Sequence, residues 1–269
     1  MTSANILISI ILYFSVLLLI SFSTKGDGNT SFFSANKKSP WYVVAFGMIG
    51  ASLSGVTFIS VPGWVEASKF SYLQMVFGYT FGYFMIATIL LPIYYKMNLT
   101  SIYTYLDSRL GSQSYITGAS FFLLSRVIGA SFRLYLVANV LQLLVFNSMG
   151  VPFWLTVTIT IILIWVYTFK SGIKTIVWTD TIQTFFMIFA VILCLNKLMG
   201  LMDINISDFM NQIIDSPQSQ IFFFEDYKSS NYFWKQFFSG VFIAIAMTGL
   251  DQDMMQKNLT CKSLKDAQK

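Results

Sequence analysis

The sequence has little charge and no histidine. Of its 269 residues, 11% are charged, 55% are hydrophobic and 17% are aromatic. Because a soluble domain carries about 25% charged residues, this composition indicates a membrane protein. The absence of His excludes HExxH metalloproteases, His-ligated haem and Ser-His-Asp triads within this chain.

Cysteine is also scarce, and the two cysteines are not placed as a disulfide framework. Cys194 lies in an apolar run and Cys261 in a polar tail. The net charge of +5 is spread over the segments between apolar runs, which argues against nucleic-acid binding and for control of topology. No basic residue precedes the first apolar run, so we interpret residues 5–22 as a retained span and not as a signal peptide.

Seven apolar runs approach or exceed the ~20 residues that a membrane-crossing helix needs. We predict a single transmembrane domain over residues 1–269, with spans at about 5–22, 41–65, 72–95, 114–146, 152–169, 174–199 and 233–250. The fourth span is long enough to tilt or to protrude.

The distribution of basic residues orients these spans. With the N-terminus outside, the inside loops hold eleven basic residues: Lys25, Lys37, Lys38, Lys96, Arg109, Lys170, Lys174, Lys257, Lys262, Lys265 and Lys269. The outside loops hold three: Lys69, Lys228 and Lys235. The positive-inside rule therefore predicts an outside N-terminus, an outward-facing loop at 200–232 and a cytoplasmic end whose charges from Lys257 onward are solvated.

The second span contains a polar stretch where it should be most apolar. Four of the seven residues from Ala51 to Thr57 are Ser, Gly or Thr, Gly50 precedes them, and Pro62-Gly63 follow. We predict a helix broken at mid-span, because irregular backbone survives at membrane depth only when it is buried in protein or lines a cavity. Secondary transporters use such breaks to bind ions and substrate. Singly, Ser52, Ser54 and Thr57 are typical of back-bonding to their own helix; as a cluster with the glycines they favour a binding site.

Two arginines lie inside the fourth span. Each costs at least ~2.5–3.5 kcal/mol at the centre of a lipid-facing helix, so both are expected to face protein or water. Arg126 and Arg133 are seven residues apart and share one helical face. We predict that Arg133 binds a substrate carboxylate through two hydrogen bonds; the alternative is a structural Arg bonded to carbonyls or to an acidic neighbour.

Asp180 is the acidic residue inside a span. Asp180, Gln183 and Thr184 share a face by their i, i+3, i+4 spacing. Their oxygens suit Na⁺, which prefers oxygen ligands, so we predict a cation pathway here; the alternative is an ion pair with an Arg of the fourth span.

The third span offers a weaker candidate and a packing motif. The amide of Gln74, near its outer end, is suited to a sugar-like hydroxyl or is simply interfacial. Gly78 and Gly82 repeat every four residues, as do Gly47, Ala51 and Gly55 in the second span. This spacing lets helices approach closely.

Several of these segments together resemble one family. They are Ser52-Leu-Ser-Gly-Val-Thr-Phe-Ile-Ser-Val-Pro-Gly63, Tyr105-Leu-Asp-Ser-Arg-Leu-Gly111, Tyr167-Thr-Phe-Lys-Ser-Gly-Ile173, Val177-Trp-Thr-Asp-Thr-Ile-Gln183 and Gly249-Leu-Asp-Gln-Asp-Met-Met-Gln256. Over essentially the whole chain, the sequence resembles the sodium:solute symporter family of sodium-coupled sugar, proline, vitamin, iodide and sialic-acid carriers.

The resemblance implies an all-α, LeuT-like fold of two inverted five-helix repeats, often with an extra leading helix. Residues 5–22 correspond to the extra helix, the next five spans to the first repeat, and 233–250 to the first helix of the second repeat. The chain would then stop in a cytoplasmic loop, with the rest of the second repeat missing as a separate C-terminal half. We expect this fragment alone to form neither the main sodium site nor a working transporter.

The resemblance also implies site residues. It assigns a main Na⁺ site to the backbone carbonyls of Gly50 and Leu53, with hydroxyl ligands from the missing half, and a second Na⁺ site to Asp180. The proline carriers have an acidic residue where Ser52 stands, and the glucose and galactose carriers an amide where Thr57 stands. The hydroxyl cluster with Arg133 looks closest to the sialic-acid carriers.

We therefore predict sodium-coupled symport of a small anionic solute, such as a sugar acid like sialic acid, by alternating access in the plasma (inner) membrane. A neutral sugar or other solute is the alternative substrate. A seven-helix receptor or a structural membrane protein is the alternative class. A photoreceptor needs a Lys in its last helix to bind retinal, and here only Lys235, at the edge of the last span, is available. Enzymatic activity is not expected, because no His, Cys or carboxylates cluster within the spans.

Overall fold

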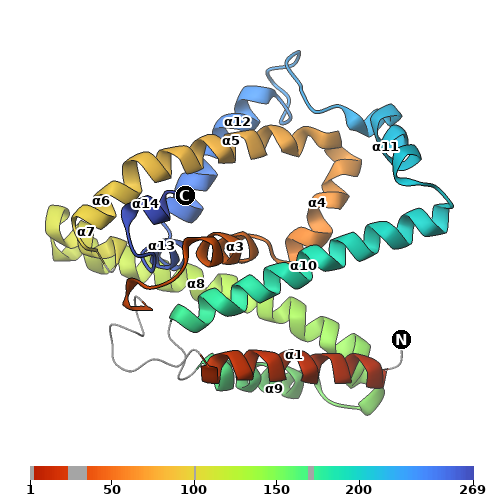
Figure 1. Cartoon of the computed structure of the whole chain (residues 1–269), viewed down its shortest axis with the longest axis horizontal. Helices are drawn as coiled ribbons and strands as arrows, with labels where there is room; N and C mark the ends of the chain where they lie inside the picture. The colour runs from red at the N-terminus through yellow and green to blue at the C-terminus, as the bar shows by residue number, and fades with distance from the viewer. Residues whose placement is uncertain (1–2, 24–34, 100, 169–172) are drawn as a thin grey trace. The chain divides into compact units, whose positions relative to one another are not determined.

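The computed structural model describes residues 3–23, 35–99, 101–168 and 173–269, mostly as helix (Figure 1). Within these residues the only pairing of extended backbone is one parallel bridge between Ser39 and Cys261. The all-α prediction is confirmed. Lys25, Lys170 and residues 169–172 of one family-like motif lie outside the described residues.

The chain divides into two compact units. The first comprises residues 1–36 and 99–179. Its helices are α1 (Ser3–Ser23), α7 (Ile102–Leu110), α8 (Ser112–Leu141), η4 (Gln142–Phe146), η5 (Asn147–Met149), α9 (Phe153–Thr168) and the start of α10 (Ile173–Met202). Within it, α1 packs against η4 and α9. The chain turns from α7 back along α8 at Gly111, whose φ of +87° is a conformation that glycine adopts without strain.

The second unit comprises residues 37–98 and 180–269. The short helix η1 (Ala35–Lys37) lies at its start. Its helices before α10 are α3 (Trp41–Ser52), α4 (Gly55–Ser68), η2 (Lys69–Ser71), α5 (Tyr72–Met85), η3 (Ile86–Leu90) and α6 (Leu91–Lys96). After the remainder of α10 come α11 (Ile206–Asp215), η6 (Pro217–Ser219), α12 (Phe233–Ala244), η7 (Ile245–Gly249), α13 (Gln252–Asn258) and α14 (Leu264–Ala267).

Helices α5 and α12 lie side by side through glycines (Figure 1). A Cβ at Gly78 would overlap the carbonyl oxygen of Phe237, and a Cβ at Gly240 would overlap the carbonyl oxygen of Met75. The four-residue spacing of Gly78 and Gly82 thus predicted a close approach correctly, and the structure shows that the partner is α12. Because glycine has no side chain, the backbones of α5 and α12 come into contact at these positions, where larger residues would hold the helices apart.

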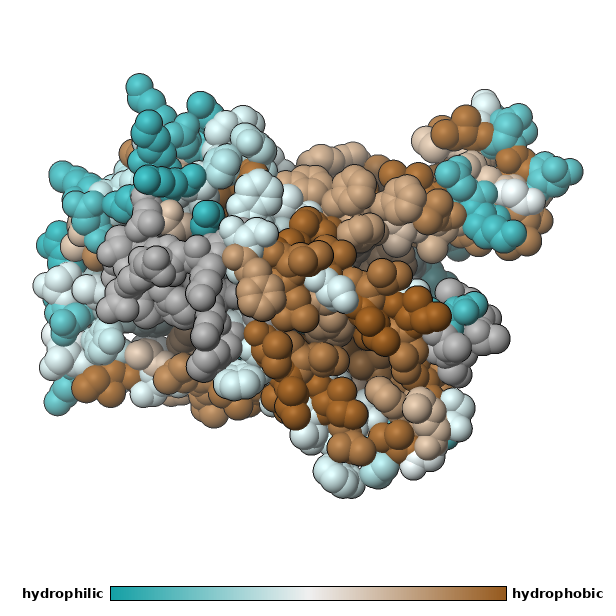
Figure 2. Space-filling view, turned by 60° about the horizontal axis from the view of Figure 1, so that its bottom comes forward, coloured by the Kyte–Doolittle hydropathy of each residue, from teal (hydrophilic) through white to brown (hydrophobic). Residues whose placement is uncertain are grey.

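Apolar stretches dominate the described helices. Four are long and apolar enough to cross a membrane by length and composition: Asn5–Ser23, Gly55–Lys96, Ser112–Met149 and Ile173–Met202. Phe233–Gly249 and Gln252–Asn258 form a further pair, bent by 72°. Trp41–Ser52 and Phe153–Val166 are shorter apolar helices. Large apolar side chains are widely exposed, as the brown areas of Figure 2 show, which suits contact with lipid.

The structure adds detail to one region and corrects another. The segment 200–232, predicted as an outward-facing loop, contains the amphipathic helix α11, which starts where Asn205 Oδ1 accepts a hydrogen bond from the Asp208 N–H at 2.9 Å. The helix of the last predicted span ends at Gly249, next to the predicted end at Leu250, and α13 follows beyond a bend of 72°. Lys257, expected to be solvated, is buried on α13.

The end of α13 and the residues after it are held through hydrogen bonds to their backbone carbonyls. Tyr95 Oη donates to the carbonyls of Asn258 at 3.0 Å and Cys261 at 3.2 Å. The Ser39 N–H donates to the Thr260 carbonyl at 3.1 Å. Cys261 is 1% exposed as a result, and burial raises the pKa of its thiol from 9.0 to about 11, with Asp266 adding to the effect.

Gly78→Ala should lower the free energy of unfolding by about 1–3 kcal/mol, because the added methyl group meets backbone that cannot turn away. The matched control is Gly200→Ala on α10, where nothing lies within 4 Å of the new Cβ. Thermal unfolding in detergent micelles measures both. Equal shifts for the two variants would contradict the close packing of α5 on α12.

The Cys261 thiol should react slowly with a hydrophilic maleimide in a Cys194→Ala background. At pH 8 a pKa about two units above the ordinary value lowers the thiolate fraction by about a hundredfold. The rate should still rise tenfold per pH unit above pH 9, where an ordinary thiol levels off. The same chain unfolded in SDS is the control, and similar rates in both states would rule out the buried thiol.

Candidate ion and substrate site

The predicted break in the second span is confirmed, at Leu53 and Ser54. Helix α3 ends at Ser52, and the Leu53 N–H still donates to the Ile49 carbonyl at 2.9 Å. Leu53 (φ −83°, ψ 126°) and Ser54 (φ −121°, ψ 166°) are extended, and α4 begins at Gly55. The last carbonyls of a helix lack donors within it, so this break presents carbonyl oxygens between two helix ends. The helix then runs on through Pro62-Gly63 without a second break.

The hydroxyls at the break form the N-terminal cap of α4. Ser54 Oγ accepts from the Thr57 N–H at 3.3 Å, and Thr57 Oγ1 accepts from the Ser54 N–H at 3.4 Å. The two hydroxyls lie 3.2 Å apart. This reciprocal capping box fixes where α4 starts, and the hydroxyl that donates in the 3.2 Å contact keeps one lone pair for a ligand. Ser52 is exposed at the end of α3.

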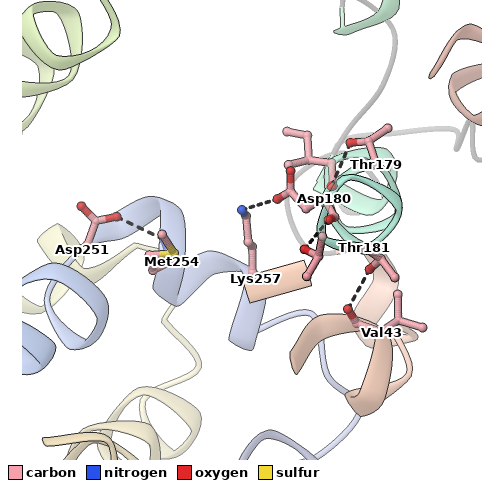
Figure 3. A network of polar contacts seen from close by, with 9 residues as sticks. Val43, Thr179, Asp180, Thr181, Asp251, Met254 and Lys257 are labelled. Carbon is pink, nitrogen blue, oxygen red and sulfur yellow. Dashed lines mark hydrogen bonds and ion pairs between the residues drawn. The ribbon is translucent and has the colours of Figure 1, made fainter. Parts of the chain in front are cut away.

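Gly50 lets α3 approach α10 closely. A Cβ at Gly50 would overlap Thr184 Oγ1 and would lie 3.0 Å from the Asp180 carbonyl oxygen. Thr184 is fully buried, and its hydroxyl donates to that same carbonyl at 2.7 Å. Thr181 Oγ1 donates to the Val43 carbonyl at 2.9 Å (Figure 3). The break is therefore supported from the side by α10, one helical turn from the Asp180 carboxylate.

The Asp180 carboxylate is paired with Lys257 of α13 (Figure 3). The Lys257 Nζ lies 2.5 Å from Asp180 Oδ2, and the side chains are 9% and 16% exposed, respectively. The alternative predicted for Asp180 is an ion pair with an Arg of the fourth span, but the pair forms with Lys257 instead. The sequence does not reveal this partner, because Lys257 is predicted to be a solvated charge outside the spans. Gln183, predicted on the same face, is exposed on α10.

A second helix break precedes Lys257, and sequence reasoning missed it. The π-helical turn η7 ends at Gly249, and the Asp251 carboxylate accepts a hydrogen bond from the Met254 N–H at 3.1 Å to start α13. Tyr94 Oη donates to the Gly249 carbonyl at 3.0 Å. The segment Gly249-Leu-Asp-Gln-Asp253 combines a glycine helix-stop signal with an Asp N-cap two residues later, so the break could have been predicted from it.

The side-chain amide of Gln74 is hydrogen-bonded to the backbone through both its nitrogen and its oxygen. Its Nε2 donates to the carbonyls of Asn231 at 2.9 Å and Ser71 at 3.2 Å, and its Oε1 accepts from the Phe223 N–H at 3.1 Å. Gln74 is fully buried. It anchors the segment before α12 to the start of α5, and both amide N–H donors are used in this contact and not on a solute.

The two arginines lie on α8, in the first unit. Arg126 is half-buried, with its guanidinium carbon 5.2 Å from the centroid of the Phe122 ring. Arg133 is exposed. A planar guanidinium that is exposed on an apolar helix is well suited to a carboxylate ligand, because it offers two parallel N–H donors.

A cation site at these breaks would rely on backbone and hydroxyl oxygens. Among the described residues, no three His, Cys, Asp or Glu side chains come together as a metal-binding group. The oxygens near Gly50 and Leu53, with the nearby carboxylate of Asp180, are of the type that hard cations prefer.

Comparison with known proteins identifies relatives of this chain. The sequence profile of the sodium:solute symporter family matches residues 32–268. The chain is 26% identical to the sodium-dependent multivitamin transporter of Oryctolagus cuniculus, over 97% of this chain and 41% of that protein. It is 26% identical to human sodium-coupled monocarboxylate transporter 1 (82% and 35%) and 27% identical to the sodium/sialic acid symporter of Aliivibrio fischeri (69% and 37%). The chain thus spans 35–41% of the length of these relatives.

The fold is that of a solved transporter. The structure of a substrate-bound, outward-open Na⁺-coupled sialic acid symporter matches with a TM-score of 0.79 and 19% identity, covering 96% of this chain and 54% of that one. The prediction of a LeuT-like inverted-repeat fold is confirmed. Likeness at this identity establishes fold alone.

Gly50→Ala should destabilise the packing of α3 on α10 by about 1–3 kcal/mol, because its methyl group overlaps the Thr184 hydroxyl. Gly50→Ala/Thr184→Ala should recover part of this loss, which a double-mutant cycle of thermal unfolding would detect. Gly55→Ala, where nothing lies within 4 Å of the new Cβ, is the control. Strict additivity of the two changes would refute the contact.

Proposed function

The chain belongs to the sodium:solute symporter family, and on that premise we propose that it is part of a multi-pass transporter that couples uptake of a small organic solute to Na⁺ entry by alternating access. The observation that carries the proposal is the extended backbone at Leu53 and Ser54, between two apolar helices. Irregular backbone at membrane depth is costly unless its polar groups bind something.

The main Na⁺ site is proposed at the carbonyls of Gly50 and Leu53. Gly50 lies in the last turn of α3, where carbonyls have no donor in their own helix, and Leu53 is extended. Close contact of Gly50 with Thr184 holds this turn rigidly. We propose that further hydroxyl ligands come from the second repeat.

The Asp180 carboxylate is proposed as a second cation ligand. It lies one turn from Thr184 and therefore near the same crossing of α3 and α10. Each net positive charge that enters per transport cycle at a membrane potential of 100 mV gains about 2.3 kcal/mol, which supports roughly a fifty-fold solute gradient.

The solute is proposed to be anionic, with Ser52, Ser54 and Thr57 offering hydroxyls and Arg133 a guanidinium for its carboxylate. The names of the relatives above include a monocarboxylate transporter and a sialic acid symporter, and both favour an acid. A sugar acid such as sialic acid is the substrate that we propose. A neutral sugar or another solute is the alternative that the test below separates.

The proposed location is the plasma (inner) membrane, with the N-terminus outside and Lys269 on the cytoplasmic side. The support is the positive-inside bias of the loops. The receptor-like and structural alternatives are not carried further, because the family and the fold are those of transporters.

Uptake by the product of the whole gene, reconstituted in proteoliposomes, tests the function. We expect an inward Na⁺ gradient to drive uptake of sialic acid or of a monocarboxylate, and a choline gradient to drive none. Na⁺-driven uptake of glucose or proline instead would overturn the proposal that the solute is an anion. Uptake that does not depend on Na⁺ would overturn the coupling mechanism.

Arg133→Ala should raise KM for the acid by at least about thirty-fold, which corresponds to about 2 kcal/mol for the loss of a carboxylate partner. Arg133→Lys should recover little, because an ammonium cannot make two parallel hydrogen bonds. Arg109→Ala, in the last turn of α7, is the control for the loss of one charge from the same unit. An unchanged KM in Arg133→Ala would refute the assignment.

A further inference from the structure

Lys257 occupies a place at Asp180 that suits a cation. Its ammonium lies 2.5 Å from Asp180 Oδ2, on a side chain that is 9% exposed. An ammonium and Na⁺ carry the same charge and use the same kind of oxygen ligand, so they repel each other at one carboxylate. Cation binding at Asp180 Oδ2 therefore competes with Lys257.

The segment that carries Lys257 is a short helix that follows a bend. Helix α13 has seven residues and follows a 72° bend, so it is not rigidly continuous with η7. Besides the ion pair, its contacts include a Tyr95 hydroxyl that the carbonyls of Asn258 and Cys261 share, a backbone hydrogen bond from Ser39 to Thr260, and the burial of Met255.

The choice of lysine fits such a competition. Lysine is a single point charge on a flexible four-carbon stem, whereas arginine would hold the carboxylate through two hydrogen bonds. Lysine therefore releases a carboxylate more readily than arginine would.

We propose that Lys257 is a tethered cation that holds Asp180 in the absence of Na⁺, and that Na⁺ arriving at Asp180 displaces it and releases residues 252–261 from α10 and α3. This inference rests on the proposed function, which gives Asp180 a Na⁺-binding role. It adds a competitor for that site and a structural consequence: occupancy of Asp180 controls whether the segment after the second break is docked.

Cys261 is a built-in reporter of this docking, because it is 1% exposed and lies four residues after Lys257. The experiment uses the product of the whole gene, with every other cysteine replaced, in proteoliposomes. The rate of labelling by a hydrophilic maleimide is measured while NaCl replaces choline chloride at constant ionic strength.

We expect Na⁺ to raise the labelling rate saturably, by at least about tenfold, which corresponds to about 1.4 kcal/mol. Lys257→Met should label rapidly without Na⁺ and show no Na⁺ dependence. Lys257→Arg, which keeps the pair, should label slowly and need more Na⁺. Lys265→Met, an exposed lysine of the same tail, should behave as wild type.

The two proposals fail differently. Na⁺-driven uptake together with Na⁺-independent labelling of Cys261 would overturn the tethered cation and leave the transport function intact. A Na⁺ response that persists in Lys257→Met, or a Lys257→Arg variant that responds like wild type, would overturn it as well. Loss of Na⁺-driven uptake in the unmodified protein would instead overturn the proposed function.

Discussion

Peptide groups in the hydrocarbon core of a bilayer have no water to bond, so each interruption of a helix there must provide partners for the groups it exposes. The second unit contains two such interruptions, before α4 and before α13. At each, a side-chain oxygen starts the next helix: the hydroxyl of Ser54 and the carboxylate of Asp251. At the second break, Tyr94 also bonds the carbonyl of Gly249. At the first, the last carbonyls of α3 have no donor within their own helix, and it is there that we propose Na⁺ to bind.

Small residues make this arrangement possible by bringing backbone close to backbone. Gly50 admits the Thr184 hydroxyl, and Gly78 and Gly240 admit the carbonyls of the opposite helix. Without side chains between them, α5 and α12 meet along their backbones, and the end of α3 meets α10. The glycines therefore have two different roles. In α3, Gly50 positions the end of the helix, where we propose the ion site, against α10. In α5 and α12, the glycines hold together the two helices that precede the second break.

Much of the fold and the first helix break could be predicted from local sequence. The partners of Asp180 and Gln74 could not, because they depend on contacts between residues far apart in the sequence. The Ser and Gly cluster at 50–57 predicted the first break because it contradicts the apolar pattern around it. The cap at Asp251 has an equally local signal in its Gly and Asp residues. The prediction that Lys257 is solvated was wrong for a different reason. A lysine near the end of an apolar run is typical of a topology signal, and only tertiary structure reveals an acidic partner 77 residues away. Gln74 likewise gave no sign in its own segment that its amide holds Phe223 and Asn231.

The charges of the proposed site also bear on how many cations it needs. An acid carried with one Na⁺ moves no net charge, so the membrane potential contributes nothing to its accumulation. A second Na⁺ restores one net charge per cycle and with it about 2.3 kcal/mol per 100 mV. The Asp180–Lys257 pair is neutral as the structure has it. When Na⁺ takes the carboxylate, the ammonium remains as an additional positive charge, which must reach water or another partner. That electrostatic demand is strongest in a low-dielectric surrounding, and it gives Na⁺ binding a direct means of driving α13 away from its docked position.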